Sequence, residues 1–261
     1  MEGKGGGVQS VTRALGLLRL MARSDEGHRV SDLAREAGLA VSTAHRLLTT
    51  LESEGFAQFD AEEALWHVGR EAYAVGAAYV QRRNFVAPAM PYLRRLRDET
   101  RETANLGVLD IDHLVTLSQV ESREIVRAIS PPGGRVPAFC SGMGKAILAT
   151  WPDDQIADFA ARTGFHPLTS HSHRGLDTAM EDIARIRGQG FAVDDEEHAP
   201  GLRCIAAVVW SESGEAACAI SISALSARLV PEKFAAAGEK VARAAADLSQ
   251  RLGGRPPLSI S

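Results

Sequence analysis

Three shortages in the sequence each exclude a class of protein. The cysteines are only Cys140, Cys204 and Cys218, with no CxxC spacing, so we expect no disulfide framework and a reducing compartment. The net charge of −4 gives no overall basic signal, so a DNA-binding surface has to be local. The longest apolar runs, such as CIAAVVW, are far shorter than the roughly 20 residues that span a bilayer, and MEGKGGGV has no apolar signal region. Together these shortages predict a cytoplasmic protein without a membrane segment.

The first 69 residues have the pattern of a DNA-binding fold. Apolar residues at Val11, Leu15, Leu18 and Met21 have helical spacing. DLAREAG, with Ser31 as its cap, and LAVSTAHRLLTTLESEG predict two more helices, each ending at a glycine. FAQFDAEEALWHVG alternates around a polar tip and predicts a β-hairpin. Helix, helix, tight turn, helix and hairpin make a winged helix-turn-helix over residues 8–69.

The rest of the 261-residue chain predicts a second domain. REAYAVGAAYVQRRN predicts a linker helix over residues 70–84. Beyond Pro88 and Pro91, predicted helices alternate with strands around NLGVLD, HLVTLSQV, IVRAIS, FAV, RCIAAVVW and EAACAISISA. We therefore expect an α+β chain whose second domain, residues 85–253, is a mixed α/β unit with hairpin-like strand pairs.

The predicted helix after the tight turn has two different faces. At 100° per residue, one arc is apolar and holds Val41, Ala44, Leu47, Leu48 and Leu51. The other arc holds Ser42, Thr43, His45, Arg46, Thr49 and Thr50, with no acid before Glu52. Hydroxyl and guanidinium groups bond phosphate oxygens and base edges, so we predict that Ser42, Thr43, His45, Arg46 and Thr49 contact DNA. An ordinary amphipathic helix would show the same two faces, but the preceding turn and the following hairpin favour DNA binding.

The predicted hairpin tip carries the acids Asp60, Glu62 and Glu63. Three negative charges do not suit a wing that inserts into a groove of DNA. We therefore expect this wing to contact DNA weakly or not at all.

The stretch FAVDDEEHAPGLRCIA combines four acids, a histidine and a cysteine. The acids are contiguous, so in a strand only alternate ones could converge on a metal ion. The acids also oppose a reactive Cys204 thiolate, because a lowered cysteine pKa needs positive charge nearby. We therefore predict no catalytic residue and no metal ion. A metal-dependent sensor or enzyme using the segment Asp194–His198 and Cys204 stays as the alternative, and HSHR at His171–Arg174 could add imidazoles to a metal site.

Two other segments offer groups for a small polar ligand. In AISIS, Ser221 and Ser223 share one face of a strand and need partners if buried. In SGMGKA, the glycines precede a helix whose free amide groups favour an anion, although the segment fails the phosphate-loop pattern. A plain glycine-rich turn would fit SGMGKA equally well.

Five long segments resemble the IclR family of bacterial transcription regulators. They are VQSVTRALGLLRLMA, GLAVSTAHRLLTTLESEGF, RVPAFCSGMGKAILA, GFAVDDEEHAPGLRCIAA and AISISALSARL. The resemblance covers about residues 8 to 252. It implies a winged helix-turn-helix, a linker helix and a GAF-like effector domain. It also implies a homo-oligomer, a dimer or a dimer of dimers, on a pseudo-palindromic operator in double-stranded DNA.

Within that family the chain looks closest to the glyoxylate-responsive branch, through HRLLTT, DDEEHAPGLRCIAA and AISISA. The resemblance implies a small carboxylate effector, glyoxylate or similar, with pyruvate also open, and no cofactor. The matching effector-binding positions are Gly142, Met143, Asp194, Cys204, Ser221 and Ser223. We expect the serines and the Gly142–Gly144 amides to hold the carboxylate. Asp194 would accept from a hydrated aldehyde or only brace its loop.

Overall fold

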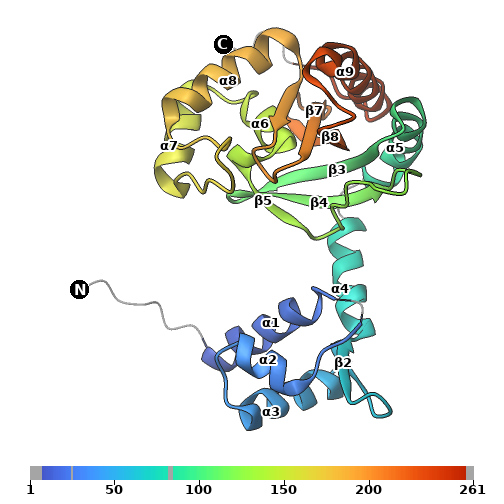
Figure 1. Ribbon diagram of the computed structural model, residues 1–261, viewed down its shortest axis with the longest axis vertical. Coiled ribbons are helices and arrows are strands. Elements are labelled where there is room, and N and C mark those ends of the chain that lie inside the picture. Colours follow the sequence, from blue (N-terminus) through green and yellow to red (C-terminus); the bar gives the residue numbers. More distant parts are fainter. Residues whose placement is uncertain (1–7, 25, 82–84, 257–261) are drawn as a thin grey trace. The chain divides into compact units, whose positions relative to one another are not determined.

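The structure, a computed structural model, describes residues 8–24, 26–81 and 85–256 (Figure 1). The chain divides into two compact units, Met1–Arg83 and Asn84–Ser261. Residues 82–84, the end of the linker helix predicted over 70–84, lie outside the described residues. Within the described ranges, no helix is long and apolar enough to cross a membrane.

The N-terminal unit is a winged helix-turn-helix followed by a further helix. Its elements are α1 (Gln9–Met21), α2 (Val30–Glu36), α3 (Val41–Ser53), β1 (Ala57–Asp60), β2 (Leu65–Val68) and α4 (Arg70–Gln81). The turn between α2 and α3 contains Gly38 at a positive φ of 63°, and the Leu39 amide donates to the Ala34 carbonyl. The strands pair antiparallel, and His28 adds a bridge to Trp66. A small core joins these elements: Leu17, Met21, Leu33, Ala34, Ala44, Leu48, Ala57 and Trp66.

Two details of this unit differ from the sequence-based expectation. The helix α2 begins before Ser31, and no side chain caps it, so the predicted cap is wrong. On α1, Leu17 and Met21 are buried, whereas Val11 and Leu15 are about half exposed. The buried face of α1 is therefore rotated from the predicted one.

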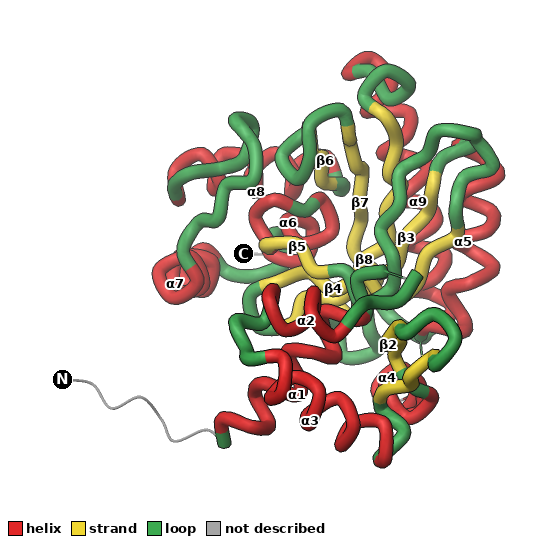
Figure 2. The backbone as a smooth tube through the Cα atoms, turned by 60° about the horizontal axis from the view of Figure 1, so that its bottom comes forward, coloured by secondary structure: helices red, strands yellow, loops and turns green. Residues whose placement is uncertain are grey.

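The C-terminal unit is an antiparallel sheet between two layers of helices. The strands are β3 (Thr103–Asp110), β4 (His113–Val120), β5 (Arg135–Pro137), β6 (Ala192–Asp195), β7 (Leu202–Trp210) and β8 (Ala216–Leu225), in the order β5-β4-β3-β8-β7-β6. The helices are α5 (Val86–Thr100), α6 (Gly142–Leu148), α7 (Asp153–Thr163), α8 (Leu176–Gln189) and α9 (Phe234–Arg251), with short 3-10 turns at Ala138–Cys140 and Pro231–Lys233. Figures 1 and 2 show α5 and α9 on one side of the sheet and α7 and α8 on the other.

Each face of the sheet has its own apolar core. Alternate residues such as Leu106, Ile220 and Ile205 pack against α5 and α9. The intervening positions, among them Ala219 and Ala206, face α6, α7 and α8. Side chains alternate between the two faces of a strand. A polar residue therefore faces α6 if it lies at one of the intervening positions, and faces α9 if it lies at one of the others.

Two predictions for this unit are wrong. IVRAIS is an irregular loop between β4 and β5 and not a strand. The helix predicted to begin at Pro91, PYLRRLRDETR, begins earlier, at Val86, so Pro88 and Pro91 both lie inside α5. Pro88 falls in the first turn, where the helix does not use the amide hydrogen that proline lacks.

Candidate functional site

Polar side chains lie side by side across four strands, β6, β7, β8 and β3, on the α6 face of the sheet. In the strand register, Ser223 is opposite Cys204, and Cys204 is opposite Asp194. On the other side of β8, Asn105 is opposite Ser221. Residues directly opposite each other in an antiparallel pair point to the same face. Strand register thus joins four of the sequence-predicted residues into one group with Asn105, which we call the polar row.

Asn105 bonds two serines of the polar row and was not among the residues predicted from the sequence. Its Nδ2 donates to Ser221 Oγ at 3.2 Å and to Ser223 Oγ at 2.9 Å. Its Oδ1 accepts from Gln119 Nε2 at 3.2 Å. All three residues Asn105, Ser221 and Ser223 are buried. Since the amide fills an acceptor site on each hydroxyl, each hydroxyl keeps its own proton to donate. The sequence does contain one indication of this role, because Asn105 is an amide side chain inside the largely apolar segment TANLGVLD.

Asp194 is buried beside Cys204 and shapes the turn that follows it. Its Oδ1 accepts from the amides of Glu197, at 2.8 Å, and His198, at 3.2 Å. Burial, with the negative charge of Glu197, raises the pKa of Asp194 to about 7, although Lys145 opposes the rise. Near neutral pH a large share of Asp194 is therefore an uncharged carboxyl that can donate a hydrogen bond.

Cys204 has the environment of an inert thiol. Its Sγ lies 3.0 Å from Ser223 Oγ, on the side of the sheet that carries Asp194. Burial and the charge of Asp194 raise the pKa of the Cys204 thiol. A thiol with a raised pKa is not the thiolate that nucleophilic catalysis requires. The structure therefore supports a packing or ligand-contact role for Cys204.

The start of α6 faces the end of the polar row. A Cβ placed on Gly142 would lie 3.6 Å from the Asp194 nitrogen and 3.6 Å from the Cys204 oxygen. The Gly144 amide was expected to hold the carboxylate. It donates instead to Ser141 Oγ at 3.3 Å, so it is not available to a ligand. The first two amides of the helix, those of Gly142 and Met143, have no partner within the helix.

Met143 fills space on the same face of the sheet. Its side chain is buried in the apolar cluster, and its Cε would lie 3.1 Å from a Cβ placed on Gly107. Gly107 is two residues from Asn105 on β3 and so shares its face. The methionine therefore limits the room beside the polar row.

Among the described residues, the ligand atoms that could converge on a metal ion belong to His173, Asp182 and Glu197. His173 and Glu197 come from the segments of the sequence-based alternative, whereas Asp194, His198 and Cys204 are not part of this group. The Lys145 ammonium already bonds both Asp182 and Glu197, each at 2.6 Å. This ammonium supplies the positive charge that two buried carboxylates need.

The α3 helix exposes most of the side chains predicted to contact DNA. Ser42, His45, Arg46 and Thr49 are exposed, and Thr43 is half-buried. The Thr49 hydroxyl donates to the His45 carbonyl at 3.0 Å, so its proton is engaged within the helix. The arc expected to be apolar buries Ala44 and Leu48 but leaves Val41 exposed.

Two acids near this surface have structural partners. Glu52 Oε1 accepts from the Phe59 amide at 3.3 Å, which directs this carboxylate toward β1. Asp60 Oδ1 accepts from the amides of Glu62 and Glu63, at 2.8 and 3.2 Å. An acid at the hairpin tip is thus explained by its turn geometry.

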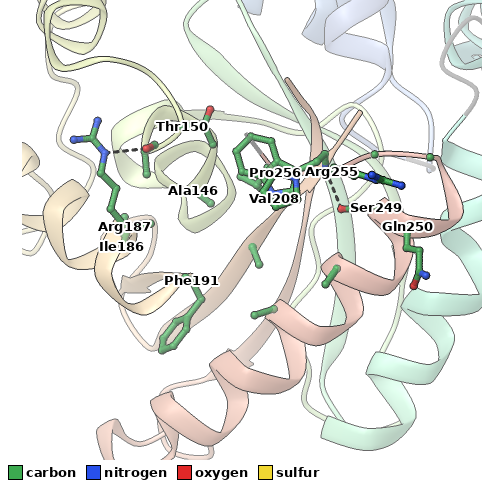
Figure 3. Close-up of a pocket in the computed structure, with 18 residues that line it drawn as sticks. Ala146, Thr150, Ile186, Arg187, Phe191, Val208, Ser249, Gln250, Arg255 and Pro256 are labelled. Atoms are coloured by element: carbon green, nitrogen blue, oxygen red, sulfur yellow. Dashed lines mark hydrogen bonds between the residues drawn. The ribbon is translucent and has the colours of Figure 1, made fainter. Parts of the chain in front are cut away.

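A cavity of about 530 Å³ lies away from the polar row, between α6, α8, β7 and α9 (Figure 3). Its walls are mostly apolar, among them Phe191 and Val208, and it shares no residue with the polar row. The Arg187 guanidinium on its wall bonds the carbonyls of Ala149 and Trp151 and the carboxylate of Asp153. The polar row has converging donors and a carboxyl of raised pKa, so we take it as the candidate effector site.

Comparison with known proteins gives concordant matches to both units. The model of the IclR helix-turn-helix domain matches residues 10–61, and that of the bacterial transcriptional regulator IclR C-terminal domain matches residues 77–250. The chain is 39% identical over 251 residues to the transcriptional repressor IclR of Escherichia coli, covering 95% of this chain and 92% of that protein. It is 39% identical over 244 residues to the HTH-type transcriptional regulator BhcR of Paracoccus denitrificans, covering 94% and 87%.

A solved structure agrees at the level of the fold. The crystal structure of the Thermotoga maritima IclR superimposes with a TM-score of 0.77 at 23% identity, covering 94% of this chain and 98% of that one.

Proposed function

The chain belongs to the IclR family of bacterial transcriptional regulators, and from that premise we propose that a small oxo-carboxylate at the polar row sets its operator affinity. It is a DNA-binding regulator with a C-terminal effector domain, and its relatives are regulators and not enzymes. The observation that supports the proposal is the buried amide of Asn105, which orients two serine hydroxyls on the face that carries Asp194. We favour glyoxylate as the effector and keep pyruvate as the second candidate.

The polar row offers hydrogen-bond donors to a carboxylate. Ser221 and Ser223 each accept from Asn105 and so direct their own protons elsewhere. The amides of Gly142 and Met143 at the start of α6 add two more donors. Several donors on one oxyanion, away from bulk water, compensate for the loss of hydration that burial of a carboxylate entails.

Asp194 would serve the ligand with the oxygen that the turn does not use. Its Oδ1 is occupied by the Glu197 and His198 amides. The other oxygen, when protonated, donates to the carboxylate, and when ionised it accepts from the hydroxyls of hydrated glyoxylate. Both roles suggested by the sequence, bracing the turn and binding the ligand, are thereby assigned to different oxygens.

The affinity for glyoxylate should fall as pH rises above 7. The ligand carboxylate is ionised throughout this range, and the pKa of Asp194 in the free protein is raised to about 7. If the bound state requires the neutral carboxyl, each pH unit above 7 lowers the affinity by up to about tenfold. Calorimetry at pH 6, 7 and 8, in buffers of different ionisation enthalpy, measures both the affinity and the proton uptake.

Asp194→Asn is the matched control, because it keeps a donor and cannot ionise. Its glyoxylate affinity should be flat over the same pH range. A pH-independent affinity of the wild-type protein would contradict the neutral-carboxyl role. A larger loss for glyoxylate than for pyruvate in Asp194→Asn would instead support the acceptor role, because glyoxylate is the more hydrated ligand.

The raised pKa of Asp194 also has a consequence for stability. The folded state holds this proton more tightly than the unfolded chain, so the contribution to the free energy of unfolding is full below the unfolded value of 3.8 and is lost as pH rises through about 7. The Asp194→Asn variant should lack this component.

On DNA we propose a homodimer, or a dimer of dimers, that places two α3 helices in successive major grooves of a pseudo-palindromic operator. The Escherichia coli relative is a transcriptional repressor, and we extend that role to this chain. The expected footprint spans two half-sites about one helical turn, or a multiple of it, apart. Light scattering that gives a monomer, together with protection of a single half-site, would contradict this arrangement.

A further inference from the structure

Lys145 connects three elements from inside the C-terminal unit. It is the second residue of the GKA sequence on α6, and only 1% of it is exposed. Its Nζ donates to Asp182 Oδ2 of α8 at 2.6 Å and to the Val193 carbonyl of β6 at 2.7 Å. Its third bond, also 2.6 Å long, goes to Glu197 Oε1. All three ammonium hydrogens therefore have protein acceptors.

Glu197 passes this connection to the candidate effector site. It lies in the segment Asp194–His198, which we call the Asp194 turn, and its amide donates to Asp194 Oδ1 at 2.8 Å. Its carbonyl accepts from Ser172 Oγ at 2.6 Å. Lys145 therefore holds the turn through the Glu197 side chain, while Ser172 holds it through the backbone.

The conformation of the Asp194 turn depends on such contacts. Glu196 has a positive φ of 63°, which is unfavourable for a residue other than glycine. Its carbonyl accepts from Thr169 Oγ1 at 2.7 Å. A backbone held in a sparsely populated region persists only where the surrounding structure determines it.

The charges of the cluster are balanced. Lys145 faces Asp182 and Glu197, and Arg185 bonds the remaining oxygen of Asp182 at 2.9 Å. Glu197 Oε2 is buried without a hydrogen bond in the described structure, 3.9 Å from His173 Nε2. Removing the lysine alone would leave two buried carboxylates with one exposed arginine, whereas removing Lys145 together with Glu197 keeps the balance.

We propose, building on the proposed function, that Lys145 and Glu197 are positioning residues that set the effector affinity without touching the ligand. Through Glu197, the buried ammonium holds the Asp194 turn against α6. It thereby fixes Asp194 relative to the amides at the start of that helix.

The test compares full-length Lys145→Met/Glu197→Met with Arg187→Met. Arg187 also links α8 to the region of α6, through the carbonyls of Ala149 and Trp151, but it does not contact the Asp194 turn. We expect the double variant to fold, to retain operator affinity and to lose at least tenfold in glyoxylate affinity by calorimetry. Arg187→Met should retain glyoxylate affinity. The backbone amide hydrogens at positions 197 and 198 should exchange faster with solvent in the double variant, and only there.

A single variant, Glu197→Gln, covers the case in which the double variant does not fold. Its side-chain oxygen still accepts from Lys145, so affinity at low pH should be nearly unchanged. The pH midpoint of glyoxylate binding should fall, since the charge of Glu197 contributes to the raised pKa of Asp194. A purely structural role would leave the midpoint in place. The ionisable side chains that interact with Asp194 among the described residues are Lys145, Glu197, Cys140 and Cys204, and Asp182 and His173 act on Glu197.

Three results would overturn the inference. One is wild-type glyoxylate affinity in the folded double variant, and another is an unchanged pH midpoint of binding in Glu197→Gln. The third is an equal loss of affinity in Arg187→Met, which would indicate general destabilisation. If the wild-type protein binds no oxo-acid, the proposed effector function itself is wrong. Failure of the proposed function can therefore be distinguished from failure of the positioning role of Lys145 and Glu197.

Discussion

Replacing Ser221 and Ser223 together by alanine is expected to lower glyoxylate affinity by about 100-fold or more, with operator binding retained. Each hydroxyl is expected to donate to a charged carboxylate, and such a bond contributes about 1.5–3 kcal/mol. Two bonds give at least about 3 kcal/mol, and each 1.4 kcal/mol is a factor of ten in affinity. The variant also removes both acceptors of the Asn105 amide, so some loss of stability accompanies the loss of binding. Calorimetry with glyoxylate and a gel-shift titration with operator measure the two properties separately.

Ser249→Ala is the matched control for this experiment. Ser249 is as buried as Ser223, at 3% exposed, and its hydroxyl bonds the backbone of Trp210 and Ala245 on the other face of the sheet. The control should lose stability and keep its glyoxylate affinity. Equal affinities of the double serine variant and the wild-type protein would remove the polar row from the ligand site.

Arg46→Ala is expected to weaken operator binding by about 10- to 100-fold while leaving the fold intact. The guanidinium is on the exposed side of α3, and the nearest acid on that helix, Glu52, bonds the Phe59 amide instead. An arginine that grips a base edge through two hydrogen bonds contributes about 1–3 kcal/mol. The measurement is a gel-shift titration against a duplex that the wild-type protein selects from a random library.

Arg46→Lys separates base reading from phosphate contact. Lysine keeps the positive charge but lacks the planar fork of arginine. If Arg46 reads a base, the lysine variant should lose affinity for the selected duplex and discriminate poorly against a scrambled one. Wild-type affinity in Arg46→Ala would place this side chain outside the interface.

Local patterns in the sequence predicted the family, the order of domains and most elements, because these depend on periodicity and turn chemistry. The alternation in AISIS predicted that Ser221 and Ser223 share one face. In the structure both hydroxyls accept a hydrogen bond from the side-chain amide of Asn105. Asn105 escaped notice because its serine partners are 116 and 118 residues away in the chain. Strand register between distant segments is not contained in a local pattern.

Lys145 shows the same limit in another form. In the sequence, Lys145 belongs to SGMGKA, a glycine-containing segment that does not match the phosphate-loop pattern. Its burial follows from Asp182 and Glu197, which lie 37 and 52 residues further along the chain. A lysine is seldom this buried without such partners, and only the tertiary structure brings them together.

The wrong strand prediction at IVRAIS has a tertiary cause. Its β-branched residues favour a strand, but that preference expresses packing against neighbouring strands. β4 is paired instead with Arg135–Pro137, and the loop is held by Thr103 Oγ1, which donates to the Ala128 carbonyl at 2.8 Å. Ile125 is consequently 95% exposed.

We propose that a small oxo-carboxylate at the polar row changes the affinity of this regulator for DNA, and one titration tests this most directly. Wild-type protein bound to its selected duplex is titrated with glyoxylate, with pyruvate and with acetate as a carboxylate that lacks the oxo group. We predict that glyoxylate changes the apparent operator affinity by at least fivefold, the lower end of common allosteric couplings. The Ser221→Ala/Ser223→Ala variant should show no change. An operator affinity that neither oxo-acid alters in the wild-type protein would contradict the account.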